Sequence, residues 1–376
     1  MAFDREKYGR RLPAADGAPF VPRDPDAAPA PDRLPMAYVL PLAGTGDTDL
    51  AELTGYLREL SRSVDVTVVD ASPPELFARH AAAWRGLVRH VPPDPALRGS
   101  NGTALGVLTG VALARHEHVV IAGSDVRYDR AALRAVHGLL DRVDLVRPQH
   151  HFDPSPWPAW WDTGRLLLHR AFGGDRPGSL AVRRSTFLAM GGYNPDVRFG
   201  SLELVRTVRA YGAATAAPAW LYVRQRPPTV ARFRRQRVRQ AYDDLARPGW
   251  LVAALAVLPA TAAALAARRP GLLLRAGVAT VAVAELGRRR AGGAQVFPAH
   301  TALAAPVWLL ERGVCAWLAL GRRLREGGTG ADARPVAHTT RALRRRLADR
   351  RPDDDLVLWV ETGAAPAPAR ADRLAG

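Results

Sequence analysis

The sequence is poor in cysteine: Cys315 is the single cysteine among 376 residues. One cysteine excludes an intramolecular disulfide and any zinc site that is built from cysteine ligands. The first residues, MAFDREK, also lack the apolar core of a signal peptide. We therefore expect the first half of the chain to stay in the cytosol.

Acidic residues are outnumbered, because 36 Asp and Glu face 53 Lys and Arg, giving a formal net charge of +17. Such a balance favours anionic partners, for example nucleic acid, anionic lipid or a phosphorylated substrate. The arginines are spread along the whole chain, without a helix-turn-helix pattern or a platform of aromatic and basic residues. No nucleic-acid partner is therefore expected.

Composition divides the chain into four regions. Residues 1–35 are rich in Pro, Ala and Asp without periodicity, which predicts a flexible N-terminal segment. Residues 36–246 alternate short apolar runs with helical patterns. Composition predicts an apolar helical, membrane-associated module over residues 247–326 and a basic, partly disordered tail over residues 327–376.

Residues 36–246 have the pattern of an α/β fold. Four apolar runs predict strands, and two segments with helical spacing lie between them: AYVLPL, VDVTVV, LVRHV and HVVIA for the strands, 49–60 and 103–115 for the helices. Strands that alternate with helices predict a mostly parallel sheet covered on both faces. Ligands of such sheets bind beyond the carboxyl ends of the strands, where Asp70 and Asp125 fall.

Three apolar stretches, 250–267, 271–286 and 296–320, are each bounded by arginine clusters. A membrane span needs about 20 apolar residues, so the first is borderline, the second is short and the third is interrupted by Glu311 and Arg312. Arginines at the borders suit lipid head groups. We expect one to three spans or interfacial helices, and the alternative is a buried Ala-rich helical subdomain.

Polar residues at the predicted strand ends are candidates for ligand binding. Asp70 could hydrogen-bond a ribose or a base edge, although a strand-ending Asp often forms a turn. Asn101 lies in the Gly-bearing loop GSNGTALG, where backbone amides and a helix N-terminus could meet a phosphate. Asp125, in GSDVRYD, could hold Mg²⁺ or Mn²⁺, which prefer carboxylates and phosphate oxygens.

In this order the segments resemble the family 2 glycosyltransferases, whose catalytic domain has the GT-A fold, in particular the membrane-associated bacterial type. The segment GSLAVRRSTFLAMGGYN looks like the acceptor-side segment of that family. RFRRQRVRQAYDD resembles the Q-x-x-R-W element, with Gln236 and Arg239 in the matching positions and Gln240 in place of Trp. The resemblance runs from about Tyr38 to Ala246.

The resemblance implies a glycosyltransferase at the cytoplasmic membrane, with its GT-A-like domain facing the cytosol. It would move a sugar from a nucleotide-sugar donor to a lipid-linked or polysaccharide acceptor of the cell envelope, with inversion. The implied roles place Asp70 on the nucleoside, Asp125 on a divalent metal (Mg²⁺ or Mn²⁺), and Gln236 and Arg239 on the diphosphate or acceptor. Asn101 belongs to the same donor-binding set.

Two motif positions depart from the family pattern. The D-x-D positions read Gly123-Ser124-Asp125, so one acid of two remains. The acidic pair that supplies the catalytic base falls on Gly200 and Ser201, and an unassisted serine hydroxyl is too weak a base at neutral pH. These departures lead to a second hypothesis, a catalytically impaired homologue that binds a glycan, a nucleotide or a partner protein.

Two other acids are candidates for the missing base. Glu203 could serve if its loop brings it inward, and the alternative is a helix-start Glu that favours the helix dipole. Asp162, beside Trp160 and Trp161, lies in the acceptor-side stretch, and the alternative is an N-cap of a helix over 163–171.

Overall fold

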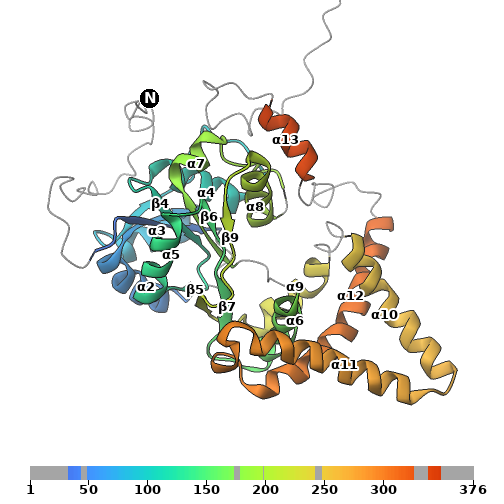
Figure 1. The fold of residues 1–376 in the computed structure, drawn as a ribbon. Coiled ribbons are helices and arrows are strands. Elements are labelled where there is room, and N and C mark those ends of the chain that lie inside the picture. The colour runs from blue at the N-terminus through green and yellow to red at the C-terminus, as the bar shows by residue number, and fades with distance from the viewer. Residues whose placement is uncertain are drawn as a thin grey trace, which may run out of the picture.

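The computed structural model describes residues 33–43, 49–172, 178–197, 199–241, 248–325 and 338–348. An α/β part surrounds a central sheet, and a group of long helices from the C-terminal half lies beside it (Figure 1). The predicted class, α/β with a C-terminal set of apolar helices, is confirmed.

The central sheet has seven strands in the order β3-β2-β1-β4-β8-β6-β9. Their bounds are β1 (Met36–Leu42), β2 (Asp65–Asp70), β3 (Arg89–Val91), β4 (His118–Ala122), β6 (Leu145–Val146), β8 (Ser179–Arg183) and β9 (Thr215–Ala216). Strands β1 to β4 are parallel, whereas β8 is antiparallel to both β4 and β6. The carboxyl ends of β1, β2 and β4 therefore share one edge of the sheet.

Helices cover both faces of this sheet because successive side chains of a strand point in opposite directions. Tyr38 and Leu40 of β1 pack with α2 and α5, whereas Val39 packs with α4, α7 and α8. The helices are α2 (Leu50–Ser63), α3 (Pro74–Trp84), α4 (Gly102–Leu113), α5 (Arg130–Leu140), α7 (Arg184–Ala189) and α8 (Gly200–Tyr211). Two apolar cores result, one on each face.

Helix α4 lies unusually close to β1, and two glycines make this approach possible. A Cβ atom on Gly110 would lie 2.2 Å from Cγ1 of Val39, and one on Gly106 would lie 3.0 Å from Cβ of Pro41. Contacts this short leave no room for a side chain. The close packing fixes the N-terminus of α4 near the carboxyl edge of the sheet.

A second, three-stranded sheet follows the end of β4. Its order is β5-β10-β7, with β5 (Val126–Arg127), β10 (Tyr222–Gln225) and β7 (Gln149–Phe152). Gln225 of β10 pairs with Val126 of β5 in antiparallel register. Val126, the residue after Asp125, therefore pairs with β10, and Gln225 of β10 is 100 residues from Asp125 in the sequence.

The long helices are α6 (Trp157–Ala171), α9 (Val230–Ala241), α10 (Pro248–Ala266), α11 (Pro270–Arg289) and α12 (Ala304–Arg325), with short 3-10 turns η2 (Arg290–Gln295) and η3 (Ala299–Leu303). Leu167 and Leu168 of α6 share a core with Ala284, Phe297 and Trp308. The core that holds α11 and α12 thus includes α6, which precedes the predicted domain boundary at residue 246. The last described helix, α13 (Thr340–Ala348), packs on α8.

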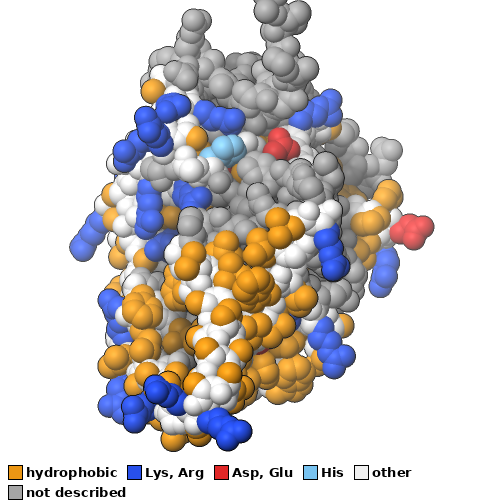
Figure 2. Space-filling model, turned by 90° about the vertical axis from the view of Figure 1, so that its right-hand side faces the viewer, with side chains coloured by type: hydrophobic (Ala, Val, Ile, Leu, Met, Phe, Trp, Pro, Cys, Tyr) orange, Lys and Arg blue, Asp and Glu red, His pale blue; other side chains and the backbone are white. Residues whose placement is uncertain are grey.

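Within the described residues, three helical segments are long and apolar enough to cross a membrane: Gly249–Ala266, Pro270–Gln295 and Ala299–Gly321. Their exposed side chains include Val252, Leu274, Val278 and Leu318. Figure 2 shows hydrophobic side chains gathered over the face of the molecule that holds these helices, with basic side chains at its borders. A large exposed apolar face of this kind marks an interaction surface.

Candidate functional site

Asp125 lies at the carboxyl edge of the sheet, three residues after β4 ends at Ala122. Its Oδ2 accepts a hydrogen bond from Nε2 of Gln225 at 2.9 Å, and its backbone carbonyl accepts one from the Arg226 amide at 2.7 Å. Among the described residues, no Arg or His forms an ion pair with this carboxylate. A neutral amide therefore orients Asp125 and leaves its negative charge uncompensated.

The glycine that replaces the first acid of D-x-D suits this arrangement. A Cβ atom on Gly123 would lie 2.9 Å from Oδ1 of Asp125, so any side chain there would push the carboxylate away. No described residue joins Asp125 in a group of three metal-binding side chains. A Mg²⁺ or Mn²⁺ ion would take one protein oxygen here and the rest of its ligands from phosphates and water, as Mg²⁺ often does. The predicted role of Asp125 as a metal ligand therefore depends on a diphosphate that supplies further oxygens.

Two arginines next to Asp125 meet at Glu52 of α2, a residue that the sequence did not single out. Arg127 Nε donates to Oε1 of Glu52 at 3.0 Å, and Arg226 Nη1 donates to Oε2 at 2.7 Å. Burial alone would raise the pKa of Glu52, but hydrogen bonding and attraction from Arg127 outweigh it and lower that pKa. The Arg226 side chain is 37% exposed, and its guanidinium also lies 3.9 Å from Asp49.

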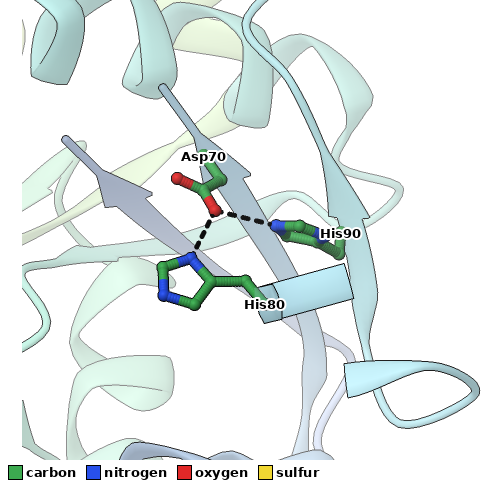
Figure 3. A group of neighbouring side chains, drawn as sticks. All are labelled: Asp70, His80 and His90. Carbon is green, nitrogen blue, oxygen red and sulfur yellow. Dashed lines mark hydrogen bonds and ion pairs between the residues drawn. The ribbon is translucent and has the colours of Figure 1, made fainter. Parts of the chain in front are cut away.

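Asp70 ends β2 at the same edge, but its carboxylate is fully buried. Oδ1 accepts a hydrogen bond from the Ser72 amide, and Oδ2 contacts the rings of His80 and His90 (Figure 3). Burial would raise the pKa of Asp70, but hydrogen bonds from His90, Ser72 and His80 outweigh it and lower the pKa to about 2. The nucleoside contact stays a prediction, and it would require both rings to move.

Asn101 is the N-cap of α4. Its side-chain oxygen accepts a hydrogen bond from the Ala104 amide at 3.2 Å, and its Nδ2 donates to the Val197 carbonyl at 3.0 Å. The side chain thus ties the start of α4 to the turn that follows Gly191-Gly192-Tyr193. Contact with a phosphate stays a prediction for Asn101.

Glu203 lies in the first turn of α8, as the helix-start alternative predicts, and is fully buried. Its Oε1 lies 2.6 Å from Nδ1 of His338, and its Oε2 accepts a hydrogen bond from the His338 amide at 2.8 Å. These contacts come from the residues that lead into α13. In this conformation Glu203 holds a C-terminal segment and does not face solvent.

Asp162 does not cap a helix, so that alternative is wrong. Helix α6 begins at Trp157, because a proline in the first turn, here Pro158, needs no backbone amide donor. Asp162 therefore lies inside α6, where Oδ1 and Oδ2 both accept hydrogen bonds from Nη2 of Arg237 of α9, at 2.7 and 2.9 Å. Its role as a base stays a prediction.

Arg237 of α9 is 11% exposed and contacts both α6 and α12. Besides Asp162 it contacts Glu311 of α12 at 3.4 Å, and its guanidinium lies over the Phe233 ring at 3.9 Å. Gln236 and Arg239 lie on either side of Arg237 in the sequence of α9, but their side chains lie outside the described residues. Their predicted contacts with the diphosphate or acceptor stay predictions.

No family model and no curated protein matches the chain. Among solved structures it is similar to the mannosyltransferase PcManGT from Pyrobaculum calidifontis in complex with GDP-Man and Mn²⁺, with 20% identity over 79% of this chain and 91% of that chain, at a TM-score of 0.44. It is also similar to glucosyl-3-phosphoglycerate synthase from Mycobacterium tuberculosis in complex with Mn²⁺, UDP and glucosyl-3-phosphoglycerate, with 16% identity over 54% and 76% of the chains, at a TM-score of 0.37. Likeness at these TM-scores does not establish the reaction of this chain.

Proposed function

We propose that the protein is a GT-A-type glycosyltransferase of family 2 that uses a nucleotide-sugar donor. The observation that carries the proposal is the state of Asp125: an acid at the carboxyl edge, oriented by Gln225, bound through its carbonyl to the backbone amide of the partly exposed Arg226, and without a cationic partner among the described residues. A carboxylate and an arginine in this place suit a diphosphate with its Mg²⁺ or Mn²⁺ ion.

The residues of the chain would divide the work as follows. Asp125 holds the metal, which neutralises charge on the departing diphosphate when it is bound. Arg226 supplies a second positive charge at the same edge, and Gln236 and Arg239 contact the diphosphate or the acceptor. The inverting step also needs a base, and both candidates, Asp162 and Glu203, would first have to leave their present partners.

The acceptor is proposed to be lipid-linked or part of a cell-envelope polysaccharide. Three apolar helices lie beside the α/β part, and two of them, α11 and α12, pack directly on α6. An enzyme held in this way at the cytosolic face of the cytoplasmic membrane would meet lipid-linked acceptors there. The predicted alternative, a buried helical subdomain, is disfavoured by the exposed apolar side chains of these helices.

The test is nucleotide binding by the full-length protein in lipid nanodiscs. A thermal-shift and calorimetry panel of UDP, GDP and CDP, each with and without Mn²⁺, should show a metal-dependent response to one nucleotide. Asp125→Asn keeps the size of the side chain and should weaken that binding by about 100-fold. Asp153→Asn, which changes an exposed acid 3.6 Å from Arg224, is the matched control. Equal metal-dependent binding by wild type and Asp125→Asn would refute the assignment.

A second candidate function, a binding protein without turnover, is favoured by one observation. Both candidate bases are held by basic residues, Asp162 by Arg237 and Glu203 by His338. This hypothesis predicts nucleotide binding without hydrolysis or transfer of the donor sugar. Detectable release of nucleoside diphosphate from a radiolabelled donor would rule it out.

A further inference from the structure

Three buried side chains converge at the carboxyl end of β2. Oδ2 of Asp70 lies 2.7 Å from Nδ1 of His80 and 3.0 Å from Nε2 of His90 (Figure 3). The three side chains are 0%, 4% and 6% exposed, and they come from β2, α3 and β3. Two imidazole nitrogens and one carboxylate oxygen therefore lie within 4.8 Å of one another in the interior.

The surroundings hold these three side chains in place. The His80 ring stacks on Trp84 with ring centroids 4.7 Å apart, and the His90 ring stacks on Phe77 at 4.4 Å. The second oxygen of Asp70 accepts a hydrogen bond from the Ser72 amide at 2.9 Å. Packing and outer hydrogen bonds of this kind orient the ligands of metal sites in proteins.

Charge favours a cation at this point. A buried carboxylate is costly unless a positive charge compensates it. The described arginines form no ion pair with Asp70, so a positive charge at this point comes either from a protonated ring or from a bound cation. Both rings also contact Oδ2 of Asp70, although two hydrogen-bond donors could equally have bound one carboxylate oxygen each. A cation would draw all three ligand atoms to one point.

We propose that Asp70, His80 and His90 form a binding site for a divalent first-row transition metal, with Zn²⁺ as the ion. Imidazole with carboxylate suits Zn²⁺ better than Mg²⁺ or Ca²⁺, which prefer oxygen ligands. Metal–ligand bonds of about 2.0 to 2.2 Å would require the three atoms to separate slightly on binding. Each neutral ring would bind through an unprotonated nitrogen, Nδ1 of His80 and Nε2 of His90, and carry its proton on the other ring nitrogen.

The role of this ion would be structural. Its ligands join a central strand to the edge strand β3 and to α3, so that binding would stabilise the folded state by mass action. The proposed metal site shares no residue with the Asp125 site, and metal binding there does not depend on sugar transfer. It would also commit Asp70 to the metal, so that nucleoside recognition would fall to other residues.

The test is metal binding by the full-length protein in nanodiscs after treatment with a chelator. Co²⁺ should bind with one equivalent per chain and give a visible d–d absorption spectrum, and Zn²⁺ should displace it. X-ray absorption of the Zn²⁺-loaded wild type should show two imidazole ligands, a measurement that needs no variant. His90→Gln, on the short strand β3, should weaken binding by about 100-fold or more.

Two control variants each remove a histidine that lies outside this site. His116→Gln removes a ring that contacts one acid, Asp65, at 2.9 Å, and His137→Asn alters the other His/Asp group among the described residues, which includes Asp141. Neither should change the Co²⁺ spectrum. Absence of the spectrum in the wild type, unchanged binding by His90→Gln, or loss of binding in His137→Asn would overturn the proposal. Asp125→Asn should lose nucleotide binding and keep the Co²⁺ spectrum, which separates this proposal from the glycosyltransferase proposal.

Discussion

Asp125 at the carboxyl edge of the sheet is held differently from the acids Asp162 and Glu203 at the helical interfaces. At the edge, a neutral amide from Gln225 orients Asp125. At the interfaces, the guanidinium of Arg237 binds Asp162, and His338 binds Glu203. A buried acid that is paired with a basic group joins helices together, whereas an acid held by an amide keeps its charge for a ligand. The contrast favours Asp125 as the binding residue among these three acids.

The largest expected effect is on stability, from Arg237→Ala at the helical interface. Asp162 and Arg237 are 6% and 11% exposed, and removing one partner of a buried ion pair typically costs about 3 to 5 kcal/mol. Chemical denaturation in detergent should show this loss. The double variant Asp162→Leu with Arg237→Met should recover most of it. If Arg237→Ala is as stable as the wild type, the ion pair with Asp162 does not stabilise the packing of α6 against α9.

The small sheet that supports Asp125 should lose stability in acid through His150. Burial lowers the pKa of His150 to about 4, against an opposing attraction from Asp125, and its Nε2 lies 3.0 Å from the Ser179 hydroxyl. Between pH 6.5 and 4 the unfolded chain binds a proton that the folded chain does not, so stability falls as pH falls. The slope is about 1.4 kcal/mol per pH unit.

The measurement is the free energy of unfolding as a function of pH, for wild type and His150→Asn. The variant lacks the titrating ring, so its curve should be flatter between pH 6.5 and 4. Parallel curves would show that His150 is not held neutral by its surroundings.

At the edge itself, Asp125→Asn should weaken Mn²⁺-dependent nucleotide binding by about 100-fold, or roughly 2.7 kcal/mol. Stability should change little, because asparagine can still accept the hydrogen bond from Gln225. Calorimetric titration with and without Mn²⁺ checks this. A loss of stability as large as that expected for Arg237→Ala would show that Asp125 stabilises the fold, as Asp162 does.

The smallest effect should come from Gly123→Ala. The added Cβ atom would meet Oδ1 of Asp125 at 2.9 Å, and the end of a flexible side chain can move aside. We expect a stability loss below about 1 kcal/mol and a measurable weakening of nucleotide binding. Unchanged binding would mean that the orientation of Asp125 is unimportant.

Much of the fold follows from local sequence patterns. The strands at 36–42, 65–70 and 118–122 and the helices at 50–63 and 102–113 lie within a few residues of their predicted positions. Alternation of apolar residues and helical spacing depend on neighbours in the chain, so they can be read without a structure. The position of Asp125 at the carboxyl edge follows from the same pattern, since parallel strands end together.

The partners of the charged residues could not be read in this way. Glu52 and Arg226 are 174 residues apart, Glu203 and His338 are 135 apart, and Asp162 and Arg237 are 75 apart. His80 and His90 follow Asp70 at equal spacings of ten residues, yet their convergence depends on how α3 and β3 pack against β2.

The sequence by itself determined the α/β order of elements, the apolar C-terminal helices and the place of Asp125, because these depend on local periodicity. Only the tertiary structure decided which of the candidate acids are bound by basic side chains, and that Asp125 has no such partner among the described residues. That outcome depends on which distant segments pack together, and burial then makes each pairing strong enough to fix a side chain.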